Sequence, residues 1–135
     1  WTINGVSSGN SQTLGVNNTT VGTFEYEVLV TDPVTTCFTR DSTVYTINPS
    51  PTFTAASTGA IACGASTGQI NINITAPATN LFQYSLTSAA TNRSQQDRPV
   101  GTYPETGLAQ GTYNILVIDQ VSGCSSSTAV PINNI

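Results

Sequence analysis

The chain has 135 residues, of which Thr, Ser and Asn account for 49, and only 7% are charged. A globular protein is normally about a quarter charged, so this composition is typical of a secreted chain that is solvated by hydroxyls and amides. The net charge of −4 and the absence of Lys and His argue against nucleic-acid binding, and no apolar run approaches the roughly 18 residues of a membrane span.

Alternation of hydrophobic and polar residues runs through the sequence, and no helical period competes with it. Before the joint Asn48-Pro-Ser-Pro51 it predicts strands at Trp1–Asn4, Gln12–Val16, Phe24–Thr31 and Ser42–Ile47. After the joint it predicts strands at Thr52–Ala56, Gln69–Thr75, Phe82–Thr87, Thr112–Ile118 and Ser126–Ile132. Short strands separated by turns that contain Gly and Pro predict an all-β sandwich.

An internal repeat organises these strands. The segment Tyr26–Cys37 recurs at Tyr113–Cys124, 87 residues further along, with Tyr, Leu, Val, Asp, Val and Cys identical. The repeating unit is therefore about 85 residues long. Residues 49–135 are predicted to form one complete immunoglobulin-like repeat, and residues 1–48 the C-terminal part of a preceding one. The front strands of that first repeat, about 37 residues, are expected upstream in the same polypeptide or from another chain.

Two local patterns favour the immunoglobulin-like topology. The run Leu108-Ala-Gln-Gly-Thr-Tyr113 is typical of a tyrosine corner, in which a Tyr hydroxyl bonds to the backbone a few residues upstream. In the first repeat either Phe24 or Tyr26 would take this role. Trp1 is predicted to be a core residue, because a Trp on the third strand is common in the core of such folds.

Several motifs together resemble a known family. Cys63-Gly-Ala-Ser-Thr-Gly-Gln-Ile, Phe82-Gln-Tyr-Ser, Gly107-Leu-Ala-Gln-Gly-Thr-Tyr113 and Gly123-Cys124 are similar to the SprB-type and PKD-like repeats of Bacteroidota cell-surface proteins, which include gliding-motility adhesins exported by type IX secretion. The resemblance implies an extracellular location in a tandem array. Asp41-Ser42-Thr43 also resembles a Bacteroidota O-glycosylation motif, which makes Ser42 a candidate modification site.

The cysteine count is odd, at three. In a secreted composition cysteines usually form disulfides, so we predict a Cys63–Cys124 bond that closes a loop of about 60 residues and contributes roughly 4 kcal/mol. Cys37 is the repeat equivalent of Cys124, and its partner would lie outside this chain. The alternative of a reactive thiol lacks a His or Lys to stabilise a thiolate.

Candidate binding and catalytic residues are few. Asp32 and Asp119 each follow a strand and are predicted to cap turns by accepting backbone N–H bonds; calcium at these positions would need more oxygen ligands than the sequence clusters there. The longest stretch without a strand pattern, Ser88–Glu105, is predicted to be a loop whose Arg93, Arg98 and Tyr103 either bind a ligand or belong to a crossover between sheets. No set of residues predicts catalysis, a metal site or a cofactor.

These observations favour a structural or adhesive tandem repeat of a large secreted cell-surface or filament protein, without enzymatic activity. Its expected partners are neighbouring repeats of the same protein and, beyond them, surface glycans or other surface proteins. Two alternatives stay open. One is a carbohydrate-binding module that uses exposed aromatic residues such as Tyr103, and the other is a pilus-like subunit completed by a strand from a neighbouring chain.

Overall fold

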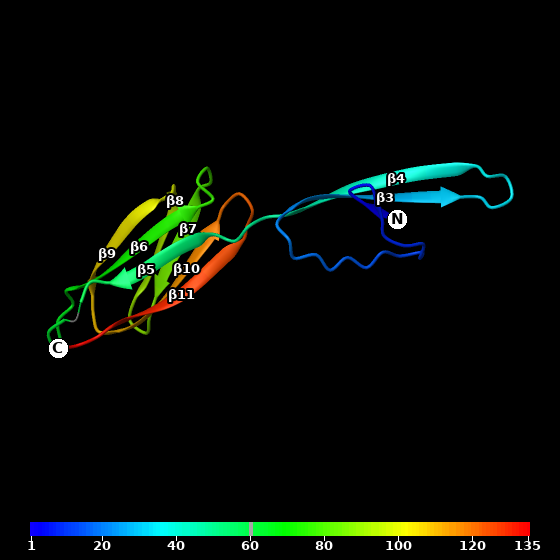
Figure 1. Ribbon diagram of the computed structural model, residues 1–135. Helices are drawn as coiled ribbons and strands as arrows, with labels where there is room; N and C mark the ends of the chain where they lie inside the picture. The colour runs from blue at the N-terminus through cyan, green and yellow to red at the C-terminus, as the bar shows by residue number, and fades with distance from the viewer. Residues whose placement is uncertain (60) are drawn as a thin grey trace. The chain divides into compact units, whose positions relative to one another are not determined.

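The chain folds into two compact units, residues Trp1–Asn48 and Pro49–Ile135, shown as a computed structural model in Figure 1. The structure describes residues 1–59 and 61–135. Every regular element in these ranges is a β-strand, and none of their residues belongs to a helix that could cross a membrane. The boundary between the units falls at the Pro-containing joint, where Pro residues withhold backbone donors from a sheet.

The second unit is an immunoglobulin-like sandwich, as the alternation predicts. Its strands are β5 (Thr52–Ser57), β6 (Gly68–Ala76), β7 (Phe82–Thr87), β8 (Asn92–Arg98), β9 (Gly101–Leu108), β10 (Gly111–Asp119) and β11 (Ser125–Ile132). One antiparallel sheet has the order β11-β10-β7-β8 and the other the order β5-β6-β9. The two sheets enclose a single core.

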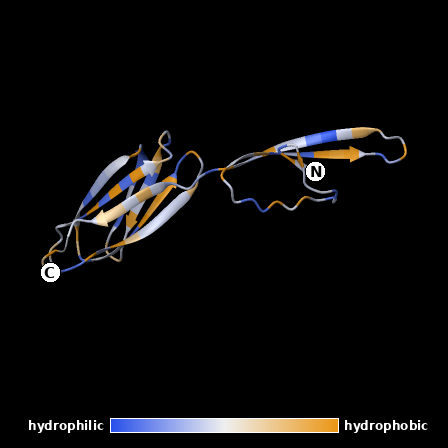
Figure 2. Cartoon of the chain, in the orientation of Figure 1, coloured by the Kyte–Doolittle hydropathy of each residue, from blue (hydrophilic) through white to orange (hydrophobic). Residues whose placement is uncertain are grey.

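Side chains at every second position of the strands build this core. Ile70, Ile72 and Ile74 of β6 are at most 1% exposed, as predicted, and Figure 2 shows the alternation along this strand. Tyr113 and Val117 of β10, also at most 1% exposed, belong to the same core cluster. Burying each such side chain stabilises the fold by about 1.5–3 kcal/mol, which explains why the register is well defined.

The tyrosine corner predicted for the second unit is confirmed. The Tyr113 hydroxyl donates a hydrogen bond to the Ala109 carbonyl oxygen at 3.0 Å, which ties the start of β10 to the segment that arrives from the other sheet. In the first unit, register places Tyr26 at the equivalent position, because Tyr26 lies opposite Thr43 as Tyr113 lies opposite Val130. The buried Tyr26 hydroxyl has no hydrogen-bond partner among the described residues.

The first unit is a single sheet. Its strands are β1 (Thr2–Ile3), β2 (Val6–Ser7), β3 (Gly22–Thr31) and β4 (Phe38–Ile47), in the order β2-β1-β3-β4. This order matches β8-β7-β10-β11 of the second unit, so the first unit has the counterpart of one sheet of the sandwich. Among its described residues only Tyr26 is a buried hydrophobic residue, whereas Trp1, predicted to be core, is half-buried.

Two predicted elements are wrong. Gln12–Val16 is not a strand, although it precedes β3 as β9 precedes β10. In the second unit β9 forms its ladder with β6, and the first unit has no counterpart of β6, so this segment has no strand to pair with. Ser88–Glu105 is not a loop: it holds β8 and most of β9, which only Pro99 and Val100 separate. Polar residues such as those of β8 form an edge strand without a hydrophobic period.

Candidate functional sites

The turns after β3 and β10 are the clearest shared feature of the two units. Asp119 Oδ1 accepts hydrogen bonds from the backbone N–H groups of Val121 at 2.9 Å and Ser122 at 3.4 Å. Asp32 Oδ1 does the same with Val34 at 2.8 Å and Thr35 at 3.3 Å. The turn-capping role predicted for both aspartates is confirmed.

Electrostatics fit this capping role. Hydrogen bonds from the Val34 backbone and from Thr35 hold the pKa of Asp32 below its usual value. Burial alone would raise the pKa of Asp119, but hydrogen bonds from Asn80, Val121 and Ser122 outweigh it and lower that pKa. Both carboxylates are therefore acceptors fixed in a turn rather than bases poised to take up a proton near neutral pH.

A polar network lies at the margin of the sandwich core where β7, β8 and β9 meet. Glu105 is 7% exposed, and its carboxylate accepts hydrogen bonds from the Tyr84 hydroxyl at 2.8 Å and the Arg93 guanidinium at 3.1 Å. Arg93 also donates to the Thr106 carbonyl oxygen at 2.8 Å. Burial, together with the hydrogen bond to Glu105 and its charge, raises the pKa of Tyr84 above the usual value of a phenol.

Arg98 and Tyr103 lie beside this network. The Arg98 guanidinium carbon lies 5.6 Å from the centroid of the Tyr103 ring, and the Tyr103 hydroxyl donates to the Pro99 carbonyl oxygen at 2.5 Å. The Tyr103 ring lies 5.6 Å from that of Tyr84 and packs against the core. The structure thus brings Arg98 and Tyr103 together, but it binds Arg93 to Glu105 instead of presenting all three on a loop.

The predicted Cys63–Cys124 disulfide is not formed in the structure. Cys124 directly precedes β11, whereas Cys63 lies near Asn134, just beyond the other end of that strand, with its sulfur 3.8 Å from Asn134 Nδ2. The eight residues of β11 span roughly 25 Å, and a disulfide needs Cα atoms within about 7 Å. The two cysteines therefore lie at opposite ends of the sandwich. Cys37 is exposed, and its predicted partner outside this chain stays a prediction.

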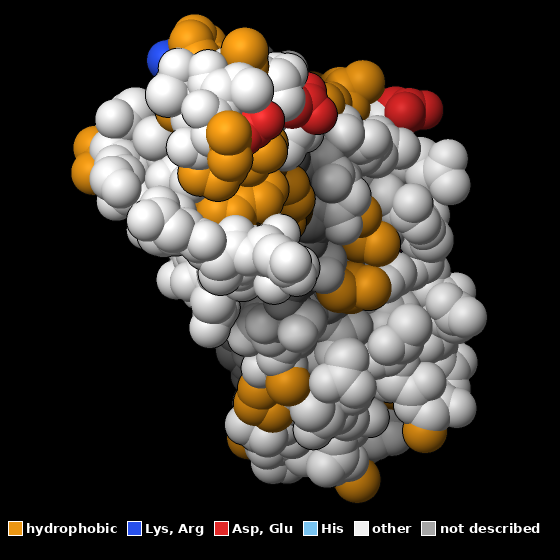
Figure 3. All heavy atoms as spheres, turned by 90° about the vertical axis from the view of Figure 1, so that its right-hand side faces the viewer, with side chains coloured by type: hydrophobic (Ala, Val, Ile, Leu, Met, Phe, Trp, Pro, Cys, Tyr) orange, Lys and Arg blue, Asp and Glu red, His pale blue; other side chains and the backbone are white. Residues whose placement is uncertain are grey.

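Ser42, the candidate glycosylation site, lies within β4 opposite Glu27. Its side chain is exposed, and its backbone N–H donates to Asp41 Oδ1 at 2.9 Å. The position is accessible to a modifying enzyme, and its modification stays a prediction. Figure 3 shows one face of the molecule, on which uncharged side chains predominate and acidic and basic side chains are few.

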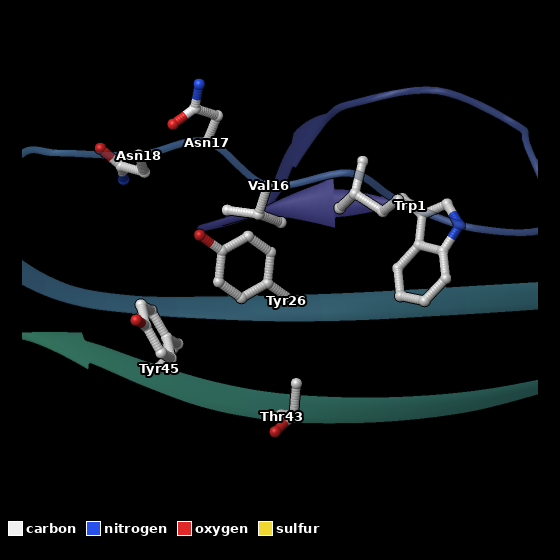
Figure 4. Close-up of a pocket in the computed structure, with 8 residues that line it drawn as sticks. Trp1, Val16, Asn17, Asn18, Tyr26, Thr43 and Tyr45 are labelled. Carbon is white, nitrogen blue, oxygen red and sulfur yellow. The ribbon is translucent and has the colours of Figure 1, made fainter.

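A groove on one face of the first unit was not predicted from the sequence. It has a volume of about 480 Å³ and is shown in Figure 4. Its lining residues are Trp1, Leu14, Val16, Asn17, Asn18, Tyr26, Thr43 and Tyr45. Tyr26 and Tyr45 project from β3 and β4 toward the segment that carries Val16, whereas Asn17 points away from the strands.

No family model matches the chain, and no curated protein is significantly similar to it. The resemblance to the SprB-type and PKD-like repeats therefore stays a prediction.

One groove residue that the sequence analysis did not single out, Tyr45, has a signal in its repeat position. Tyr45 is the register equivalent of Ile132, which packs into the core of the second unit. An aromatic residue at a core position of an incomplete repeat therefore indicates a hydrophobic face without its partner sheet.

No group of three or more metal-ligating side chains gathers within residues 1–59 and 61–135.

Proposed function

We propose that the chain is a structural or adhesive stretch of tandem immunoglobulin-like repeats from a large secreted bacterial cell-surface or filament protein, of the SprB-type and PKD-like kind. It has no enzymatic activity and needs no cofactor. One observation carries the proposal: both units contain the same β-hairpin, closed by the same Asp-capped turn, at equivalent positions in the sequence repeat. A turn reproduced in such detail is what a tandem array of one module is expected to show.

The path of the chain through the second unit supports a spacing role. The unit is entered beside the start of β11, where the Ser126 hydroxyl donates to the Pro51 carbonyl oxygen at 2.7 Å. It is left beyond the other end of β11, where Ile135 N–H donates to the Ile61 carbonyl oxygen at 2.9 Å. Entry and exit thus lie at opposite ends of the sandwich, so repeats joined in series gain length with each module.

The two alternatives differ in their support. A carbohydrate-binding surface at Tyr103 is not favoured, because this ring is half-buried against the core and Arg98 lies over it. A glycan array that showed binding at millimolar concentration or better, lost in Tyr103→Ala, would reverse this judgement. The second alternative, completion of the first unit by a strand from a neighbouring chain, stays a prediction.

Single-molecule stretching of the chain between two handles tests the spacing role. The second unit, Pro49–Ile135, should unfold in one step, because both of its sheets share one core. Its 87 residues extend to roughly 300 Å from a folded length of roughly 30 Å, so the expected gain is about 270 Å. Gradual extension without a step of this size would contradict the proposed spacing role.

A further inference from the structure

The edge strands of the second unit differ in charge from one side of the sandwich to the other. One side ends in the edge strands β8 and β9, which carry Arg93, Asp97, Arg98 and Glu105. The other side ends in β5 and β11, which lie beside each other (Figure 1) and contain no charged residue. Charged side chains on an edge strand hinder its pairing with a strand of another molecule. The β8–β9 side has this protection, whereas the β5–β11 side lacks it.

β5 is the less protected of the two uncharged edges. β11 contains Pro131, which has no N–H to donate, and just beyond its end the Asn133 carbonyl oxygen accepts a hydrogen bond from Ile61 N–H at 2.9 Å. β5 contains no Pro, and within the described residues its ladder is with β6 alone. The register shift of that ladder lies between Thr52 and Phe53. The rest of β5 is therefore a regular strand with one free edge.

The inner side chains of β5 are incompletely covered. Phe53 and Ala55 pack against the core but are only partly buried. Ile74 and Ile72, which lie opposite them on β6, are at most 1% exposed. A groove of about 500 Å³ lies beside them, between β5 and the start of β11. A strand added at this edge would therefore cover apolar surface as well as pair with the free N–H and C=O groups of β5.

Charge favours a second copy of the chain as the source of the added strand. Residues 49–135 contain two arginines and three acidic residues, so the second unit has a net charge of −1 and two copies of it repel each other little. Because β5 has no charged residue, antiparallel pairing of β5 with its own copy brings no like charges opposite one another. A strongly charged partner would find no opposite charge at this edge.

We propose that two copies of the chain associate through β5, which pairs antiparallel with β5 of the other copy about a two-fold axis. An axis perpendicular to the sheet keeps the inner faces of both copies on the same side, so residues of the same face must lie opposite one another. The register centred on Thr54 meets this condition and places Phe53 opposite Ala55 of the other copy. This inference deepens the proposed function and rests on it, because it assigns an adhesive contact to a second copy of the same repeat.

Sedimentation of the full chain tests the proposal. The chain should form a reversible dimer as its concentration rises from about 10 µM to about 1 mM, a range that detects even a weak association. A reductant in the buffer prevents dimers that form through the cysteines. Over the same range, hydrogen exchange of the amides in Phe53–Ser57 should slow, because the free edge of β5 becomes paired.

Thr54 and Thr102 provide a matched pair of variants, because both are exposed and they flank Asn73 from the two edges of the same sheet. Thr54→Lys should weaken the dimer by about tenfold or more, since it places two like charges opposite each other, and Thr54→Glu should do the same. Thr102→Lys should leave the dimer unchanged. An equimolar mixture of Thr54→Lys and Thr54→Glu should associate at least as well as the original chain, which misfolded variants would not do.

Three results would overturn the proposal. A chain that stays monomeric to about 1 mM has no self-association at β5. A dimer that Thr54→Lys and Thr102→Lys weaken equally, or that neither weakens, associates through another surface. A mixture of the Thr54→Lys and Thr54→Glu variants that stays monomeric would show that the two copies of residue 54 do not face each other. Single-molecule stretching involves no second copy, so failure of the spacing role is distinguishable from failure of this inference.

Discussion

The two tyrosines Tyr113 and Tyr26 occupy the same position in the repeat but differ in their hydrogen bonding, which makes Tyr→Phe at each site a matched test. Tyr113→Phe removes a hydrogen bond of 3.0 Å to the Ala109 carbonyl oxygen. Such a bond contributes about 0.5–1.5 kcal/mol net, so the second unit should lose about 1 kcal/mol. Tyr26→Phe removes a buried hydroxyl that has no partner in the described structure, and should be neutral or stabilising by up to about 1 kcal/mol.

Urea unfolding measures both effects within one chain. Trp1 emission follows the first unit alone, because the chain has no other tryptophan. Backbone circular dichroism follows mainly the second unit, which holds β5 to β11. With an m-value of about 1 kcal/mol/M for a unit of this size, Tyr113→Phe should lower the second midpoint by roughly 1 M. Tyr26→Phe should leave the first midpoint unchanged or raise it.

Two results would refute this reasoning. A loss of about 1 kcal/mol in Tyr26→Phe would mean that its hydroxyl already has a partner in solution. No change in Tyr113→Phe would mean that the tyrosine corner does not stabilise the second unit.

Three further changes have expected outcomes in the same unfolding assay. Gly68→Ala would place a Cβ 2.7 Å from a backbone oxygen of β9 and should cost about 1–3 kcal/mol, whereas Gly15→Ala, with open space around it, should be nearly neutral. Because folding lowers the pKa of Asp119, the stability that its carboxylate contributes is present above about pH 4 and is lost as the pH falls further. Asp119→Asn should flatten this acid dependence and lower the free energy of unfolding by about 2 kcal/mol at neutral pH. Arg93→Met should lower the free energy of unfolding by about 1–2 kcal/mol, less than the loss of a fully buried ion pair, because the Arg93 side chain is 39% exposed. Adding Glu105→Gln should recover part of this loss in a double-mutant cycle.

The sequence predicts those parts of the fold that depend on local periodicity or on a repeated motif. Ile70, Ile72 and Ile74 are buried because a two-residue period assigns them to one face. Asp32 and Asp119 cap their turns because the short Asp side chain accepts hydrogen bonds from the backbone N–H groups two and three residues later wherever this turn forms. These features depend on neighbouring residues, so they can be found without knowing the rest of the structure.

Features that depend on distant partners were missed. The strand β8 carries alternate residues such as Arg93 that are stabilised by Glu105 on another sheet, and no hydrophobic period marks it. Gln12–Val16 has a strand-like sequence but is not a strand, because the first unit has no counterpart of β6 for it to pair with. In both cases the structure of the segment is decided by a part of the protein outside that segment.

The cysteines show why the equivalence of the two units does not depend on a covalent bridge. Cys37 and Cys124 do occupy equivalent places, since their carbonyl oxygens accept hydrogen bonds from Asp32 N–H at 2.8 Å and Asp119 N–H at 2.9 Å. Each cysteine thus closes an Asp-capped turn through its backbone, a role that any residue with the same conformation can fill. The repeat is therefore defined by hairpin register and turn geometry, and Cys63, at the far end of the sandwich, is outside that definition. Replacing Cys124 by Ser should accordingly leave the turn intact, with the hydrogen-exchange protection of Asp119 N–H unchanged, whereas loss of that protection would show that the thiol itself is required.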